Sequence, residues 1–250
     1  MPSPATPSAH AVGPHTTSPR TTTARPTAAH AATALPGPIR DEGDVRRGLD
    51  WLATADPRLA AVRERVERVR RVPLRLDRPG FAPLVEIVCA QQISRASADA
   101  IHARLRALVD PLTPGGVLRM SEADARAAGL SRPKERTLRE VARWVAAGRL
   151  DLDGVCRLPA GEAVAAITAV PGLGPWTAGV YLLFCGGHPD ILPDGDVALQ
   201  WSAADALGRA DKLSARELAR EAEAWSPWRG VASRLLWANY AVLKGREVIP

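Results

Sequence analysis

The sequence predicts an all-α protein, because helix-capping signals recur along it and apolar residues are spaced as on helix faces. Asp56-Pro57 and Thr113-Pro114 each place a capping side chain before a proline at the first helical position. Residues 121–124 resemble a capping box with aspartate in place of glutamate, and residues 214–217 form a complete one. Apolar positions three or four residues apart, as in residues 101–108, extend this pattern over about ten segments. We find no convincing period-two strand pattern.

The chain divides into a tail of residues 1–40 and a helical domain of residues 41–250. Residues 1–38 hold eight of the 22 prolines, and threonine, serine and alanine fill most of the rest. Such a segment buries too little apolar surface to offset the entropy of ordering it, so we expect it to be disordered. It lacks the apolar stretch of a secretory signal, and its prolines argue against the amphipathic helix of a transit peptide.

The charge is compatible with a polyanionic partner but does not identify one. The sequence pI is about 9.9 and the net charge is +6. Half of that excess lies in the tail, whose Arg20, Arg25 and Arg40 are accompanied by no acidic residue. The helical domain therefore carries only +3, a modest excess for a nucleic-acid-binding surface. No apolar run is long enough to span a bilayer, so we expect no membrane partner.

Metal-ligating side chains are scarce. The three cysteines, Cys89, Cys156 and Cys185, are far apart and form no CxxC pair. This pattern argues against a cysteine-built zinc site or an iron–sulfur cluster. Only His102 and His188 lie beyond the tail, so a transition-metal enzyme would lack ligands. A reducing, cytoplasmic location fits this cysteine usage best.

The most informative stretch lies between two expected helices. A helix from Glu162 to about Thr168 is followed by a turn with Gly172, Leu173 and Gly174, and Pro175 then stands where a second helix would begin. The glycines allow positive φ and a close backbone approach, while the leucine fills the gap between the helices. The open amides of the second helix form a natural phosphate site. By itself this pattern could be a mere interhelical turn.

With Thr177-Ala178 after it, the turn resembles the helix-hairpin-helix DNA-binding element. About twenty residues later Gly195-Asp196 opens another expected helix, and the combination resembles the DNA glycosylase superfamily named for the hairpin, a Gly/Pro loop and an aspartate. The resemblance covers residues 42–243 and implies two helical subdomains with a DNA-binding cleft between them. It implies that Asp196 is the catalytic aspartate and that Gly172, Leu173, Gly174 and Thr177 contact the DNA backbone. The alternative is that Asp196 only caps the helix that continues to Leu207.

One position of the hairpin separates two kinds of enzyme in this superfamily. Members that also cleave the DNA strand carry a lysine two residues beyond the second glycine, where this chain has Trp176. The only lysines, Lys134, Lys212 and Lys244, lie elsewhere in the sequence. The resemblance therefore implies a monofunctional glycosylase without lyase activity.

Two further segments are similar to the alkylpurine branch, that of bacterial 3-methyladenine glycosylase II. Residues 225–229 with Trp237 resemble the end of that domain, and residues 87–94 resemble the segment that probes the duplex, where Gln91 or Gln92 would be the probe. Residues 129–134 are also similar, although a helix-capping glycine and a solvated lysine would explain them equally well.

The resemblance implies a pocket for the flipped base built from Trp176, Tyr181 and Trp237. The sequence departs from the family pattern at two positions. Ala198 stands where glycine is common, and Gly179 stands where polar residues are more frequent.

The same resemblance bears on cofactors and partners. It implies a monovalent cation, Na⁺ or K⁺, held by the backbone carbonyls of Thr168, Val170 and Leu173, and no redox cofactor. The partner would be double-stranded DNA with damaged bases, bound by a monomer in the bacterial cytoplasm or nucleoid. Two alternatives stay open: the same fold acting on uracil or a deaminated purine, and a DNA protein that binds lesions without catalysis.

Overall fold

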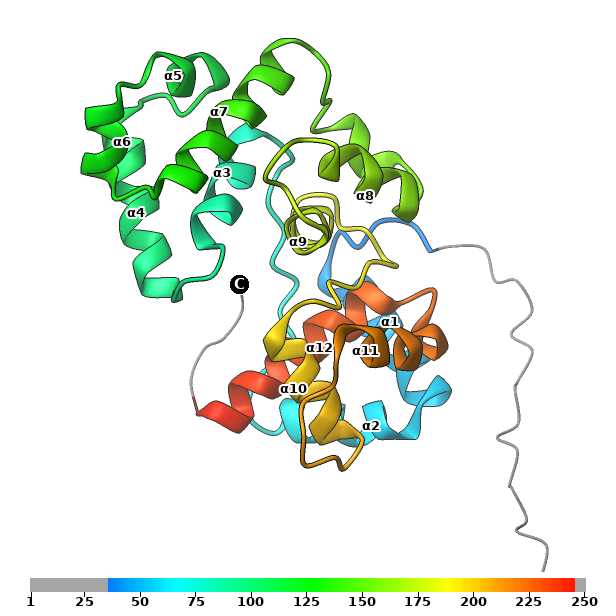
Figure 1. The fold of residues 1–250 in the computed structure, drawn as a ribbon. Coiled ribbons are helices and arrows are strands. Elements are labelled where there is room, and N and C mark those ends of the chain that lie inside the picture. Colours follow the sequence, from blue (N-terminus) through cyan, green and yellow to red (C-terminus); the bar gives the residue numbers. More distant parts are fainter. Residues whose placement is uncertain (1–35, 246–250) are drawn as a thin grey trace, which may run out of the picture. The chain divides into compact units, whose positions relative to one another are not determined.

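The computed structural model describes residues 36–245, and within this range every regular element is a helix (Figure 1). The expected all-α fold is confirmed. In chain order the helices and the two 3₁₀ segments are α1 (Glu42–Ala55), α2 (Pro57–Glu67), α3 (Phe81–Ala90), α4 (Arg95–Leu108), α5 (Pro114–Arg119), α6 (Glu122–Ala128), α7 (Arg132–Ala146), η1 (Gly154–Arg157), α8 (Ala160–Thr168), α9 (Pro175–Phe184), α10 (Val197–Ala206), α11 (Ala215–Glu221), η2 (Ala222–Trp225) and α12 (Arg229–Lys244).

Each helix start predicted from a capping signal is confirmed. The side chains of Asp56 and Thr113 accept backbone amides at the N-termini of α2 and α5, each before a proline in the first turn. Ser121 and Ser214 begin complete capping boxes on α6 and α11. These starts were predictable because a cap involves only residues three or four positions apart.

The predicted disordered tail lies mostly outside the described residues, but its boundary at residue 40 is too late. Ile39 is fully buried, and its amide donates to the carbonyl of Gly187 at 2.7 Å. The same approach explains Gly187, where an added Cβ would lie 2.3 Å from the Ile39 carbonyl oxygen. Ile39 therefore belongs to the folded part of the chain.

The helices form two packing groups, as the sequence predicted. Helices α3 to α9 pack among themselves, whereas α1 and α2 pack with α10, α11 and α12 (Figure 1). The beginning and the end of the described chain thus share one group. For example, the Arg65 Nε donates to the Oδ1 of Asn239 at 3.0 Å, joining α2 to α12.

One buried arginine connects the groups at their boundary. Arg234 on α12 is 1% exposed, and it donates to the carbonyls of Leu74, Leu183 and Gly230 at 2.7–3.0 Å. Burial, with a smaller contribution from the charge of Arg75, lowers the pKa of Arg234 to about 10. The guanidinium still carries its charge at neutral pH, and each of its three nitrogens has an acceptor.

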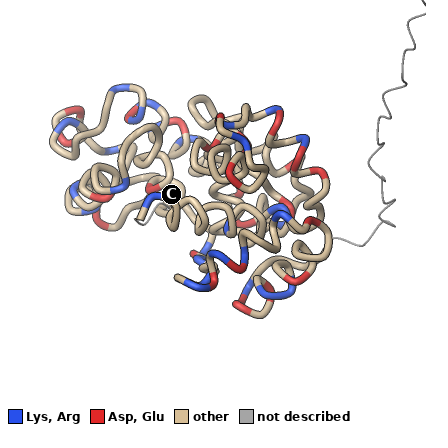
Figure 2. Tube along the Cα trace, turned by 90° about the horizontal axis from the view of Figure 1, so that it is seen from below, with Lys and Arg blue, Asp and Glu red and all other residues tan. Residues whose placement is uncertain are grey.

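The charged residues are mixed rather than segregated. Figure 2 shows Lys and Arg positions interspersed with Asp and Glu positions along the chain, and several such pairs, including Arg139–Glu135 and Arg95–Asp99, form ion pairs one turn apart. No described helix is long and apolar enough to cross a membrane. The small excess of positive charge therefore does not by itself define a DNA-binding face.

Candidate active site

The hairpin between α8 and α9 is held in place by a contact that only glycine permits. Gly172 has φ +92°, and a Cβ added there would lie 2.1 Å from the Oγ1 of Thr137 on α7. Leu173 is 5% exposed and fills the space between the helices, as predicted. The prediction for Gly174 is wrong in its φ: the residue is extended at φ −103°, and a Cβ there would meet nothing within 4 Å.

The N-terminus of α9 is open toward an external acceptor. Pro175 occupies the first turn, and within residues 36–245 no side chain caps this helix. The first-turn amides of a helix have no partner inside it, and together with the helix dipole they favour an anion. A phosphate group of a nucleic acid fits this position.

Asp196 caps α10, and two tryptophans hold the same carboxylate. Its Oδ1 accepts the amides of Ala198 and Leu199 at 2.9 and 3.1 Å, and the Nε1 of Trp237 at 3.1 Å. Its Oδ2 accepts the Nε1 of Trp176 at 2.8 Å. Asp196 is therefore a helix cap, as the alternative held, but the two indoles exceed what capping requires. Oδ1 is surrounded by three donors, whereas Oδ2 keeps a lone pair for another partner.

A groove runs past this carboxylate between the two helix groups. It is lined by residues 90–95 after α3, by the hairpin with Trp176 and Thr177, by residues 195–198, and by Trp237 and Tyr240 of α12. Asp196 is only 8% exposed, so the groove reaches a largely buried acid. The structure thus brings the hairpin, the aspartate and the candidate probe residues to one place.

The three predicted pocket aromatics have three different positions. Trp176 is half-buried and lines the groove. Trp237 borders the groove but is fully buried, and its ring packs on Phe184 at 5.4 Å between centroids. Its contact with Asp196 makes it a support for the carboxylate rather than an exposed wall.

Tyr181 is not part of the groove, and its prediction as a pocket residue is wrong. The side chain is fully buried, its hydroxyl donates to the carbonyl of Leu152 at 3.0 Å, and it accepts the amide of Gly80 at 2.9 Å. Burial raises the pKa of this phenol far above its usual value. Tyr181 therefore links α9 to the loops that contain Gly80 and Leu152, outside the groove that contains Asp196.

The two glutamines have different environments. The Nε2 of Gln91 donates to the Oγ1 of Thr177 at 2.8 Å, which ties the end of α3 to the hairpin. Gln92 is exposed and has φ +58°, an uncommon backbone conformation for a residue with a side chain. The neighbouring Ile93 is 40% exposed on the same edge of the groove. Of the two candidates, Gln92 is the one whose side chain is exposed at the groove.

Comparison with known proteins agrees with this geometry. Residues 85–228, which contain the hairpin, Asp196 and the glutamine loop, match the family described as HhH-GPD superfamily base excision DNA repair protein. The chain belongs to the HhH-GPD superfamily.

Individual relatives of this HhH-GPD protein are also similar. The probable bifunctional transcriptional activator/DNA repair enzyme AlkA of Mycobacterium tuberculosis is 31% identical over 197 residues, which are 74% of this chain and 38% of that protein. The chain therefore spans well under half of that relative. A crystal structure of a DNA-3-methyladenine glycosidase from Bacillus halodurans is 30% identical, with a TM-score of 0.68, covering 79% of this chain and 91% of that one. A Schizosaccharomyces pombe 3-methyladenine DNA glycosylase in complex with abasic DNA shares the fold, with a TM-score of 0.71 at 20% identity, covering 82% and 100%.

One of the two departures noted in the sequence, Gly179, has a local explanation in this HhH-GPD chain. A Cβ at Gly179 would lie 3.1 Å from the side chain of Pro193, so the glycine lets α9 approach the loop that leads to Asp196. Gly129 ends α6 in the left-handed conformation, as the capping alternative predicted. Lys134 is not simply solvated, because its Nζ donates to the carbonyl of Cys89 at the end of α3.

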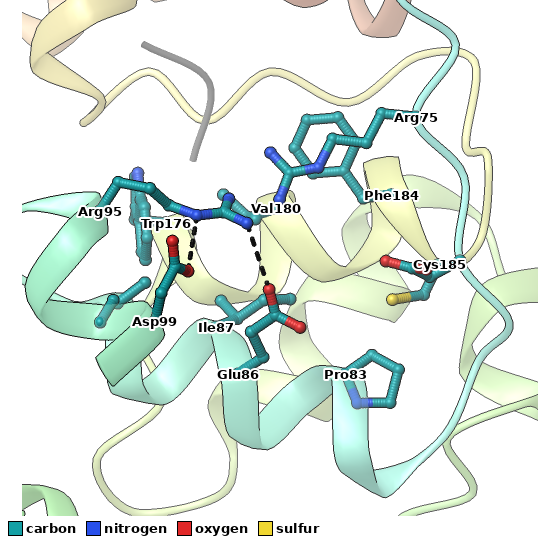
Figure 3. Close-up of a pocket in the computed structure, with 13 residues that line it drawn as sticks. Arg75, Pro83, Glu86, Ile87, Arg95, Asp99, Trp176, Val180, Phe184 and Cys185 are labelled. Carbon is teal, nitrogen blue, oxygen red and sulfur yellow. Dashed lines mark hydrogen bonds and ion pairs between the residues drawn. The ribbon is translucent and has the colours of Figure 1, made fainter. Parts of the chain in front are cut away.

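Sequence reasoning missed a second cavity next to the groove. It shares Ala90, Arg95 and Trp176 with the groove and continues between α3, α4 and α9, where Arg75 and Glu86 line it (Figure 3). Its lining comes from segments that are distant in sequence and carry no recognisable motif.

The predicted cation site remains a prediction. The carbonyl of Thr168 ends α8, and those of Val170 and Leu173 lie in the turn after it. The Val170 carbonyl also accepts the amide of Leu173 at 3.1 Å. Neutral backbone oxygens at the end of a helix suit Na⁺ or K⁺, so the donor set fits such an ion. No three His, Cys, Asp or Glu side chains in the described range gather to suit a transition metal.

Proposed function

We propose that this protein is a monofunctional DNA glycosylase that hydrolyses the N-glycosidic bond of alkylated purines, of the 3-methyladenine and 7-methylguanine type. The observation that carries the proposal is the Asp196 carboxylate, held by the indoles of Trp176 and Trp237 at the base of a groove beside the hairpin. The superfamily's base excision repair role, and relatives named as 3-methyladenine glycosylases, support it.

A single carboxylate suffices for this substrate class. Glycoside hydrolysis ordinarily uses one carboxyl group to protonate the leaving group and another to assist attack. A 3- or 7-alkylated purine is already a cation and leaves as a neutral base, so no acid is needed. Asp196 Oδ2 then stabilises the oxocarbenium-like sugar and orients the attacking water. Asp194 is not among the residues that line the groove, so it does not serve as a second, opposed carboxyl group.

Trp176 is placed to favour a cationic base. Its indole edge contacts Asp196 while its ring lies between the groove and the neighbouring cavity. A cation against the face of a tryptophan gains about 0.5–2 kcal/mol, which a neutral base does not. Together with the weakened bond of the alkylated nucleotide, this attraction favours damaged over normal bases.

The DNA contacts follow from backbone geometry more than from net charge. The hairpin amides at Gly174 and the start of α9 would bind a phosphate, and Gln92 would enter the space vacated by the extruded nucleotide. A monomer contains all of these groups on one chain.

Base release tests the proposal directly. Wild-type protein incubated with methylated duplex DNA is expected to release free 3-methyladenine, and Asp196→Asn is expected to abolish release while keeping DNA binding. Asp194→Asn is the matched control, because it makes the same substitution two residues away from the proposed chemistry. Binding without release in the wild type would favour the lesion-binding alternative. Release of uracil or hypoxanthine without alkylpurine would instead assign the other specificity.

The absence of lyase chemistry is part of the proposal. No lysine is among the residues that line the groove. Lys212 donates to the Oε1 of Gln200, and Lys244 lies over the ring of Tyr240 at 5.6 Å. Borohydride reduction during turnover traps a Schiff base between a lysine and the sugar. We expect no trapped complex, and a covalent adduct at Lys244 would overturn this part of the proposal.

A further inference from the structure

The cavity beside the groove contains a guanidinium group whose donors are not used. Figure 3 shows Arg75, from the segment between α2 and α3, stacked on the ring of Phe184 and directed into the cavity, with 4.8 Å from its Cζ to the ring centroid. Within the described residues no carbonyl or carboxylate accepts a hydrogen bond from it. Arg234 approaches the same ring at 5.4 Å, but its three nitrogens each donate a hydrogen bond to a backbone carbonyl. The two arginines therefore differ in whether they can bind something else.

The backbone of Arg75 is also strained. Its φ is +38°, one of two such values at non-glycine residues in the described range, the other being that of Gln92. Strained residues of this kind cluster at ligand-binding sites, where the surrounding structure enforces them. Burial, and next the charge of Arg95, lower the pKa of Arg75, yet a guanidinium stays protonated at neutral pH.

The other charged groups of the cavity offset this cation. Asp77, Glu86 and Asp99 line it together with Arg75 and Arg95, which gives three acids to two bases. Arg95 binds Asp99 at 2.8 Å and Glu86 at 3.6 Å and lies across the cavity in Figure 3. His102 also faces Glu86 at 3.9 Å, and burial lowers its pKa, which favours the neutral ring. A cationic base can therefore enter despite the arginine.

The cavity has a volume of about 30 Å³, so an entering base must displace one of the side chains that line it. Arg95 is the side chain that can be displaced, because it is 49% exposed and its ion pairs with Glu86 and Asp99, being exposed, are weak. The cavity adjoins Trp176, whose indole contacts Asp196. A nucleotide with its sugar at Asp196 would thus place its base past Trp176, toward Arg75.

We propose that Arg75 is a specificity-determining residue that donates hydrogen bonds to a carbonyl oxygen of the extruded base. This inference rests on the proposed glycosylase function and deepens it. A guanidinium matches an exocyclic carbonyl, as on 7-methylguanine, and opposes the exocyclic amino group of 3-methyladenine. The structure thereby favours carbonyl-bearing bases among the alkylated purines.

The test compares two bases released from the same DNA. Duplex treated with dimethyl sulfate contains both 7-methylguanine and 3-methyladenine, and their release rates are measured in single turnover. Arg75→Met keeps a stem over Phe184 but removes the donors, and we expect the ratio of 7-methylguanine to 3-methyladenine release to fall about tenfold. Arg78→Met is the matched control, since Arg78 lies on the same segment with an exposed side chain, and its ratio should match the wild type. Arg75→Lys keeps the charge but loses the planar guanidinium, so its ratio of 7-methylguanine to 3-methyladenine release should lie between those of Arg75→Met and the wild type.

The outcomes separate this inference from the function on which it rests. If both variants release the two bases more slowly and by the same factor, Arg75 acts only on the fold. If the release rates and their ratio are unchanged, Arg75 does not contact the base. Either result overturns the inference and leaves the glycosylase intact. Release of neither base by the wild type overturns the proposed function itself.

Discussion

The hydrogen bond from Trp237 to Asp196 should be worth a measurable factor in rate. Trp237→Phe removes the Nε1 donor, 3.1 Å from Oδ1, but keeps an aromatic ring against Phe184. A hydrogen bond to a charged group contributes about 1.5–3 kcal/mol, and complete loss from the transition state would slow the reaction about 10- to 150-fold. Two backbone amides still hold Oδ1, so we expect the lower end, about tenfold.

The same substitution also leaves a void, so stability needs its own control. Trp225→Phe provides it, because Trp225 is equally buried and donates its Nε1 to the Oδ2 of Asp56 at 3.0 Å, outside the groove. Each variant should lose about 1–3 kcal/mol of unfolding free energy in urea. Only Trp237→Phe should slow single-turnover release of 3-methyladenine. A folded Trp237→Phe with a wild-type rate would refute the reasoning, and so would an equal rate loss in Trp225→Phe.

Two further predictions concern the hairpin and a buried ion pair. Gly172→Ala should lower the free energy of unfolding in urea by about 1–3 kcal/mol, because the added Cβ clashes with Thr137 and the residue has a positive φ. Gly174→Ala should stay within about 0.5 kcal/mol of wild type. Equal effects of the two substitutions would contradict the conclusion that only Gly172 requires glycine. Burial raises the pKa of Asp190, but the hydrogen bonds and charge of Arg229 outweigh burial and lower this pKa from its usual 3.8. The ionised Asp190 therefore stabilises the folded protein above pH 3.8, and this stabilisation is lost as the pH falls through the lowered pKa. Asp190→Asn should therefore cost about 2–4 kcal/mol at pH 7, and urea unfolding should show the gap from wild type narrowing below about pH 4; a gap independent of pH would show that the charge is not responsible.

The sequence was most informative where function and structure depend on neighbours in the chain. The caps at Asp56, Thr113, Ser121 and Ser214 were predictable because each involves one helical turn. The position of Asp196 beside the hairpin was predictable because the spacing between the two resembles that of a known family.

Features that depend on distant segments were predicted incorrectly or missed. Tyr181 lies five residues after Trp176 on α9, and this spacing turns it toward Leu152 instead of the groove. Trp237 does border the groove, as predicted, but the hydrogen bond from its indole to Asp196 was missed. Arg75 belonged to no sequence motif, because Phe184, the ring on which it stacks, is 109 residues away. Only the structure shows that this guanidinium has no hydrogen-bond acceptor among residues 36–245.

The pairing of the first two helices with the last three governs when the site can assemble. Trp237 lies on α12, 41 residues after the aspartate that it supports, and α12 also packs on α1 and α2. During translation, Asp196 is therefore made before its indole donor Trp237, and α1 and α2 are made before α12, the helix on which they pack. A chain stopped ahead of α12 would keep the hairpin and the contacts of Asp196 with Trp176, Ala198 and Leu199, but it would lack the Trp237 donor and the helix on which α1 and α2 pack.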